Sequence, residues 1–136
     1  MRVALVSFFP LSDAPARAIT GKLEAGSVSR GNVVALISGF EDPSSAHLAI
    51  YDYVAVAISP SGFIGGKVPD SVRNFLRQAG GVSGKKGCAI VLRRGLSSGK
   101  TCRNLMRILE AEGMRLDYFD IVRDEDHALH VGTKIG

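Results

Sequence analysis

The sequence predicts a single α/β domain, built as an open, doubly wound sheet of parallel strands with helices on both faces. Five short runs rich in valine and isoleucine alternate with segments of helical periodicity. The runs at 33–40, 53–59 and 87–92 are almost continuously apolar, which is typical of strands covered on both faces. Neither a repeat nor a linker divides the 136 residues, so we expect one domain over 1–136.

The first half of the chain predicts a strand, a helix and a second strand. The run "VALVSFF" at 3–9 is the first strand. Asp13 and Pro15 are suited to the cap and first turn of a helix, whose apolar side carries Ile19 and Leu23. The second strand is the run at 33–40.

The second half predicts three strands, 53–59, 87–92 and 116–122, with a helix in each gap. Gly80 and Gly113 stand where these helices would end. Apolar residues recur at i, i+3, i+4 and i+7 in two sets: Val72, Phe75, Leu76 and Ala79, then Cys102, Leu105, Met106 and Leu109.

After the last strand, residues 123–136 contain one short apolar stretch. We therefore expect the last helix to be short or missing. An uncovered sheet face would have to be covered by another subunit or domain, so we also expect self-association into a homo-oligomer.

Composition and charge limit the class of protein. The hydrophobic fraction is 46%, and no apolar run approaches the roughly 20 residues that span a bilayer, so no membrane partner is expected. Two cysteines favour the reducing cytoplasm. The net charge is +4. No acid lies between 71 and 109, where the bases are Arg73, Arg77, Lys85, Lys86, Arg93, Arg94, Lys100, Arg103 and Arg107. Such a segment suits an anionic partner, or forms solvated helix faces.

The stretch "RRGLSSGKTC" at 93–102 is similar in context to a P-loop, because a strand precedes it and a helix follows. A P-loop needs a glycine, four residues and then Gly-Lys-Ser/Thr. The chain has Gly99, Lys100 and Thr101, but the first glycine would have to stand at Arg94. An arginine is costly where the backbone needs positive φ, so we do not expect an ATPase or GTPase.

The stretch 52–76 resembles the third strand, flavin loop and following helix of the flavodoxin-like family. An Asp precedes an apolar strand that ends in Ser-Pro, and an aromatic-and-glycine loop leads into a helix. The matching residues are Asp52, Ser59, Pro60, Phe63, Gly65, Gly66, Pro69, Val72, Phe75 and Leu76. The element order agrees over nearly the whole chain, which looks like a short-chain member. The resemblance implies the strand order 2-1-3-4-5.

The resemblance also implies FMN at the switch point, with its phosphate on the loop after the first strand. Its ring would lie between the loops after the third and fourth strands, with Phe63 stacked on it. The residues implied in FMN binding are, in the first loop, Ser7, Pro10, Ser12, Asp13 and Ala14; in the second, Pro60, Ser61, Gly62, Phe63, Ile64 and Gly65; and in the third, Arg94, Gly95, Leu96, Ser97, Ser98 and Gly99.

The first loop departs from the family pattern. It has no glycine before Gly21, its prolines lack amide donors, and Asp13 can place a carboxylate at the phosphate position. We therefore expect weak FMN binding. The pI of about 9.3 differs from that of acidic electron-carrier flavodoxins, and suits an enzyme that meets an anionic nicotinamide cofactor.

The expected function is that of a flavodoxin-like flavoprotein of redox type: a flavin or quinone reductase, or an electron-transfer protein. If it is an enzyme, it would be an FMN-dependent oxidoreductase, and the sequence assigns no catalytic residue and no metal. The alternative is a flavin-free domain that serves interaction or regulation. A nucleic-acid partner would need one contiguous basic patch and is not expected.

Two further features have structural interpretations. Cys102 stands in the first turn of a helix beside Lys100, which would favour a thiolate, but it also begins the apolar stripe and is interpreted as a core cysteine. His127 and His130 follow "DED" without a recognised metal-ligand spacing, and are interpreted as part of an exposed tail.

Overall fold

The computed structural model describes residues 1–10, 12–60, 66–95 and 97–136. Over these residues the strands form one parallel five-stranded sheet in the order β2-β1-β3-β4-β5, as expected. The strands are β1 (Arg2–Phe8), β2 (Val33–Ser38), β3 (Tyr53–Ile58), β4 (Lys86–Leu92) and β5 (Arg115–Val122).

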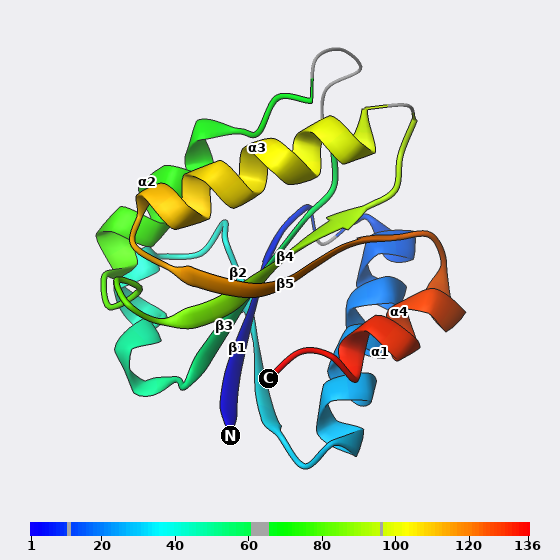
Figure 1. Cartoon of the computed structure of the whole chain (residues 1–136), viewed down its shortest axis with the longest axis horizontal. Helices are drawn as coiled ribbons and strands as arrows, with labels where there is room; N and C mark the ends of the chain where they lie inside the picture. Colours follow the sequence, from blue (N-terminus) through cyan, green and yellow to red (C-terminus); the bar gives the residue numbers. More distant parts are fainter. Residues whose placement is uncertain (11, 61–65, 96) are drawn as a thin grey trace.

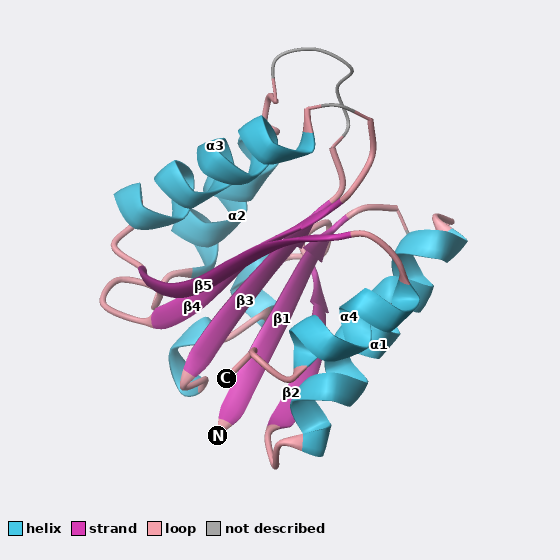
Figure 2. Cartoon of the chain, turned by 45° about the vertical axis from the view of Figure 1, so that its right-hand side comes forward, coloured by secondary structure: helices cyan, strands magenta, loops and turns pink. Residues whose placement is uncertain are grey.

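Helices cover both faces of the sheet (Figures 1 and 2). α1 (Ala14–Ser29) and α4 (Glu125–Gly132) lie on one face, and α2 (Asp70–Ala79) and α3 (Ser98–Ala111) lie on the other. Two short 3₁₀ turns, η1 (Pro43–Ser45) and η2 (Leu48–Ile50), connect β2 to β3. The predicted doubly wound architecture is confirmed.

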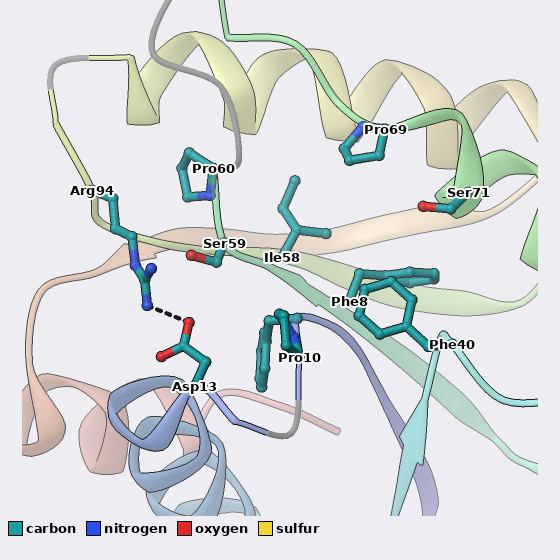
Figure 3. Close-up of a pocket in the computed structure, with 11 residues that line it drawn as sticks. Phe8, Pro10, Asp13, Phe40, Ile58, Ser59, Pro60, Pro69, Ser71 and Arg94 are labelled. Atoms are coloured by element: carbon teal, nitrogen blue, oxygen red, sulfur yellow. Dashed lines mark hydrogen bonds and ion pairs between the residues drawn. The ribbon is translucent and has the colours of Figure 1, made fainter.

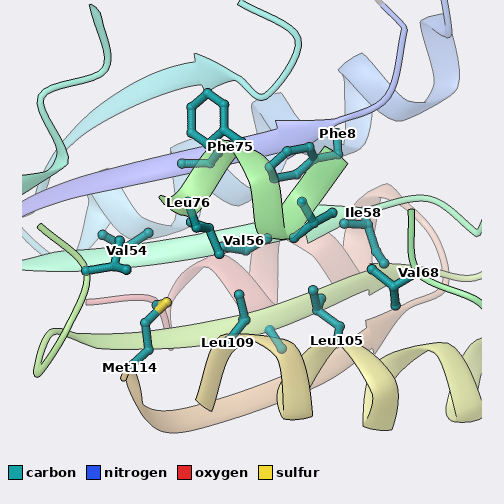
Figure 4. Close-up of a cluster of buried hydrophobic side chains, with 14 of the residues drawn as sticks. Phe8, Val54, Val56, Ile58, Val68, Phe75, Leu76, Leu105, Leu109 and Met114 are labelled. Atoms are coloured by element: carbon teal, nitrogen blue, oxygen red, sulfur yellow. The ribbon is translucent and has the colours of Figure 1, made fainter. Parts of the chain in front are cut away.

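The main core lies between the sheet and the α2–α3 layer (Figure 4). Phe75, Leu76, Leu105 and Leu109 point from the two helices onto β1, β3 and β4, whose side chains alternate between the two faces. Both apolar stripes predicted for these helices face the sheet. Gly80 ends α2 with a positive φ of 67°, a conformation that glycine adopts without steric cost.

One prediction about the strands is wrong. β2 is an edge strand that is partly open to solvent, and is not covered on both faces. Val33 is 70% exposed and Leu36 is 51% exposed, whereas every residue of β3 is buried. The apolar run of β2 therefore has a different physical setting from the runs of β3 and β4.

The interpretation of the last residues as an exposed tail is also wrong. Residues 125–132 form α4, which is short but present, and which Asp124 caps by accepting a hydrogen bond from the His127 N–H at 2.8 Å. Ala128 and Val131 are fully buried against the sheet and α1. Ser27 Oγ, from the end of α1, donates to the carbonyl of a residue just beyond α4, Ile135, at 2.9 Å.

The part of the sheet beside α4 carries polar groups. The Tyr53 hydroxyl donates to Asp117 at 2.5 Å, and the Tyr118 hydroxyl donates to Asp120 at 2.6 Å. Burial raises the pKa of both tyrosines above its ordinary value. The short last helix therefore gives no apolar reason for self-association, and a different surface is considered below. In the described part of the chain, no helix combines the length and apolar character needed to cross a membrane.

Candidate functional site

A pocket of about 290 Å³ opens beyond the carboxyl ends of β1 and β3 (Figure 3). These strands are neighbours in the sheet, and the chain winds in opposite directions on either side of them, so the pocket lies at the switch point. It is lined by Phe8, Phe9, Pro10, Asp13, Phe40, Ile58, Ser59, Pro60, Pro69, Ser71 and Arg94.

Asp13 caps the N-terminus of α1 at one side of the pocket. Its Oδ1 accepts a hydrogen bond from the Ala16 N–H at 3.1 Å. Pro15, in the first turn, has no N–H to offer. The positive end of the helix dipole, which attracts anions, is therefore already matched by a carboxylate of the protein itself.

Arg94 reaches Asp13 from the loop between β4 and α3. Its Nη2 donates to Asp13 Oδ2 at 2.5 Å, and Figure 3 shows this ion pair at the side of the pocket near α1. The Asp13 side chain is 15% exposed and that of Arg94 is 47% exposed. The pair joins two loops that are 81 residues apart in sequence.

Aromatic rings form the opposite wall. The buried Phe8 ring meets Phe40 edge to face, with centroids 6.5 Å apart, and meets Phe75 in the same way at 5.6 Å. Phe40 is 57% exposed, so it has apolar area free to contact a ligand. The wall therefore consists of flat aromatic rings, of which Phe40 is partly exposed to solvent.

Ser59 contributes an unpaired polar group to this apolar pocket. Its Oγ is buried and has no hydrogen-bond partner among the residues that the structure describes. A buried hydroxyl without a partner costs about 1–3 kcal/mol, so such groups usually meet water or a ligand. Ser59 directly follows β3, and the rigid strand fixes its position at the pocket.

No protein-family model matches the sequence, and no curated protein matches it. Solved structures do match. Oxidised flavodoxin 1 from Bacillus cereus superposes with a TM-score of 0.73 at 14% identity, over 98% of this chain and 96% of that one. Two-electron reduced Megasphaera elsdenii flavodoxin superposes with a TM-score of 0.71 at 16% identity, over 96% of this chain and 97% of that one. The chain has the flavodoxin-like fold. A WrbA-like flavodoxin from Agrobacterium tumefaciens superposes with a TM-score of 0.65 at 11% identity, over 98% of this chain and 94% of that one.

The residues that the resemblance implied in FMN binding separate into several groups in this flavodoxin-like chain. Pro10, Asp13, Pro60 and Arg94 line the switch-point pocket. Ser7 lines a different cavity, of about 280 Å³, between α1 and β2. Gly95, Ser98 and Gly99 line a third, of about 300 Å³, at the start of α3. Ser12, just before α1, and Ala14, its first residue, are exposed, and Ser97 is half-buried. Ser61, Gly62, Phe63, Ile64, Gly65 and Leu96 lie outside the described residues.

Sequence reasoning missed several residues of the pocket: Phe8, Phe9, Phe40, Ile58, Ser59, Pro69 and Ser71. Ser59 and Pro69 belong to the motif at 52–76, so their place after β3 and before α2 was a usable signal. Phe40 follows β2 and meets Phe8 only because β2 lies beside β1.

The first loop of the flavodoxin-like chain does not fit the phosphate of FMN in this conformation. Asp13 occupies the helix N-terminus, Pro10 and Pro15 have no N–H, and the nearby cation Arg94 is paired with Asp13. The pocket beside this loop has apolar walls and the Ser59 hydroxyl, which no described residue engages, and these features suit a flat ring with a polar edge.

The hydroxyls near Lys100 also argue against a P-loop. Thr101 Oγ1 donates to the Ser97 carbonyl at 3.0 Å, within the first turn of α3. Ser98 Oγ accepts from the Arg94 N–H at 3.1 Å. Both hydroxyls stabilise the start of α3, and neither is turned into a phosphate cradle.

Several bases of the basic segment already have partners. Arg77 pairs with Glu112 at 3.1 Å, Arg94 pairs with Asp13, and Lys85 Nζ donates to two backbone carbonyls near η2. The two ion pairs neutralise part of the positive charge that an extended nucleic-acid surface would need, and the Lys85 contacts fix that side chain beside η2.

Both cysteines are buried, as expected for core residues. Burial raises the pKa of Cys88 to about 12 and that of Cys102 to about 11. For Cys102, burial outweighs the nearby Arg103, which acts to lower the pKa. Neither thiol is a reactive thiolate near neutral pH.

Proposed function

We propose that this chain is a flavodoxin-like redox protein whose switch-point pocket takes a flavin ring and which binds FMN weakly. The observation that carries the proposal is the pocket itself, where the buried Ser59 hydroxyl, without a partner among the described residues, lies beside apolar walls at the fold's usual ligand position. The flavodoxins among the similar structures support the same class of ligand.

The weakness of FMN binding follows from the Asp13–Arg94 ion pair. Each charge-assisted hydrogen bond to a phosphate contributes about 1.5–3 kcal/mol, and the first loop offers few donors. Losing two such bonds lowers affinity by roughly two to four orders of magnitude. Arg94 remains available to an anionic cofactor only where the ion pair opens.

A second candidate function is a flavin-free domain for interaction or regulation, and the same ion pair favours it. Asp13 and Arg94 together satisfy the α1 terminus without any ligand. In that case the pocket would have no flavin occupant, and the fold would serve only as a scaffold.

A titration with two flavins distinguishes these functions. We expect riboflavin and FMN both to bind, with dissociation constants in the micromolar range or weaker, and with FMN favoured by less than about tenfold, because the phosphate gains little. Quenching of flavin fluorescence measures both constants. Absence of binding by either flavin at saturating concentration would support the flavin-free domain. A large preference for FMN would show that the first loop does hold the phosphate.

Ser59→Ala tests the pocket separately from the fold. The serine hydroxyl has no partner within the described chain, so its removal is expected to leave the melting temperature unchanged or slightly raised. If the hydroxyl meets the ring edge, riboflavin affinity falls by roughly tenfold. An unchanged riboflavin affinity would place the ring elsewhere, and a lowered melting temperature would mean that Ser59 has a structural partner.

A further inference from the structure

The outer edge of β2 differs from the opposite edge of the sheet. β2 (Val33–Ser38) has no charged residue, and it pairs with β1 on one side only. At the other edge, β5 carries Arg115, Asp117 and Asp120. Charged side chains on an edge strand discourage pairing with another chain, and an uncharged edge lacks this protection.

Backbone hydrogen bonds show which groups of β2 face outward. The Val33 N–H donates to the Met1 carbonyl at 2.9 Å, and the Gly39 N–H donates to the Ser7 carbonyl at 2.7 Å. The backbone N–H and C=O groups of successive residues in a strand point to opposite sides. The N–H and C=O groups of the odd-numbered residues of β2 therefore point toward β1. Val34, Leu36 and Ser38 turn their N–H and C=O groups away from β1, toward the open edge. The Ser38 carbonyl also accepts from the Glu41 N–H at 3.2 Å, in the turn that follows the strand.

Val34 and Ser38 lie two residues before and two residues after Leu36. A two-fold axis that passes beside Leu36 would therefore relate this set of outward-facing residues to the same set in a second copy. In an antiparallel pair of identical strands, residues directly opposite each other point to the same face of the sheet. A register centred on Leu36 sets Leu36 opposite the partner's Leu36, and Val34 opposite the partner's Ser38. This register uses all three outward-facing residues, and the half-exposed Leu36 side chains meet at its centre.

Charge at the two ends of β2 supports the same arrangement. Arg30 precedes the strand, Glu41 and Asp42 follow it, and all three are exposed. None of them forms an ion pair with another described residue. An antiparallel partner brings the basic end of one copy to the acidic end of the other, twice, which a parallel arrangement would not do.

We infer that the protein forms a two-fold dimer through antiparallel pairing of β2 with β2 of a second copy, centred on Leu36. The two sheets then join into one continuous sheet, in which β2 is an interior strand. The switch-point pocket is not required for this contact, so the dimer is independent of flavin binding.

Sedimentation equilibrium on the flavin-free protein, up to several hundred micromolar, tests the dimer. We expect a monomer–dimer equilibrium that Leu36→Glu weakens at least tenfold, because it sets two carboxylates on the axis. Phe119→Glu on β5 is the matched control, since Phe119 is 57% exposed and Leu36 is 51% exposed, and it is expected to change nothing. A monomer at every concentration, or equal effects of the two variants, would overturn the inference.

Charge reversal gives a second test on exposed residues that the fold does not need. Arg30→Glu and Glu41→Lys are each expected to weaken the dimer several-fold, and the double variant is expected to restore it. Circular dichroism checks that each variant is folded. A dimer that persists unchanged in both single variants would use another surface, and would contradict the antiparallel register.

Discussion

Gly26→Ala is expected to destabilise the protein by about 2–3 kcal/mol, although alanine is the better helix former. Gly26 lies where α1 crosses α4. A Cβ at this position would stand 2.3 Å from the Leu129 carbonyl oxygen and 2.8 Å from the Gly132 Cα. Both are backbone atoms, which cannot rotate away, so the helices would have to separate. Urea denaturation followed by circular dichroism measures the change in the free energy of unfolding.

Gly21→Ala in the same helix is the matched control. Outside its own helical turns, no atom of the described residues lies within 4 Å of a Cβ built at Gly21, so only helix propensity changes there. We expect this variant to be more stable than the natural chain by about 0.5–1 kcal/mol. Opposite signs for two identical substitutions in one helix would isolate the crossing with α4. Equal effects would show that α4 does not pack as closely as described.

Asp13→Gly is expected to tighten FMN binding by about one to two orders of magnitude, and to leave riboflavin binding unchanged. The substitution removes a carboxylate from the α1 N-terminus and frees the Arg94 guanidinium for the phosphate. A new charge-assisted hydrogen bond is worth about 1.5–3 kcal/mol. Glycine is tolerated as an N-cap, so the cost to the helix is only a few tenths of a kcal/mol. Fluorescence titrations with the two flavins measure the difference.

Two further variants show which group causes the tighter FMN binding expected for Asp13→Gly. Asp13→Asn keeps a side-chain cap without the charge, and should give part of the gain. Adding Arg94→Ala to Asp13→Gly should remove most of it, if Arg94 is the group that meets the phosphate. Tightening of both flavins by the same factor would mean that Asp13 restricts entry of the ring, and would contradict the assignment of the phosphate position.

The central fold could be predicted because its determinants are local. Burial can be predicted from local sequence in these elements: β1, β3 and β4 are nearly continuous apolar runs, and α2 and α3 carry apolar residues at helical spacing. The edge position of β2 came from the strand order that the resemblance implied, and its solvent exposure could not be derived locally, because its run is as apolar as those of the buried strands. The sequence predicted a last helix that is short or missing, and α4 is short; its bounds could not be predicted because an eight-residue helix has too few turns to show a period.

In the candidate site, too, local features could be predicted from the sequence and contacts between distant segments could not. The capping role of Asp13 follows from its place before a proline at a helix start, and the sequence predicted it. The partner of Asp13 could not be predicted, because Arg94 is brought near it by the pairing of three strands, β1, β3 and β4. The same holds for Phe40 against Phe8. That Ser59 Oγ is buried without a partner among the described residues is visible only in three dimensions.

The late position of α4 in the chain has a consequence for protein synthesis. The α2–α3 layer closes over its sheet face with residues that the ribosome has already released when β5 appears. The opposite face is completed later, because Ala128 and Val131 of α4 belong to the same buried cluster as Leu23 of α1, and they are made only after β5. A nascent chain stalled after β5 therefore exposes the apolar side chains that α4 covers in the folded domain, and such a surface is prone to aggregation and is bound by chaperones.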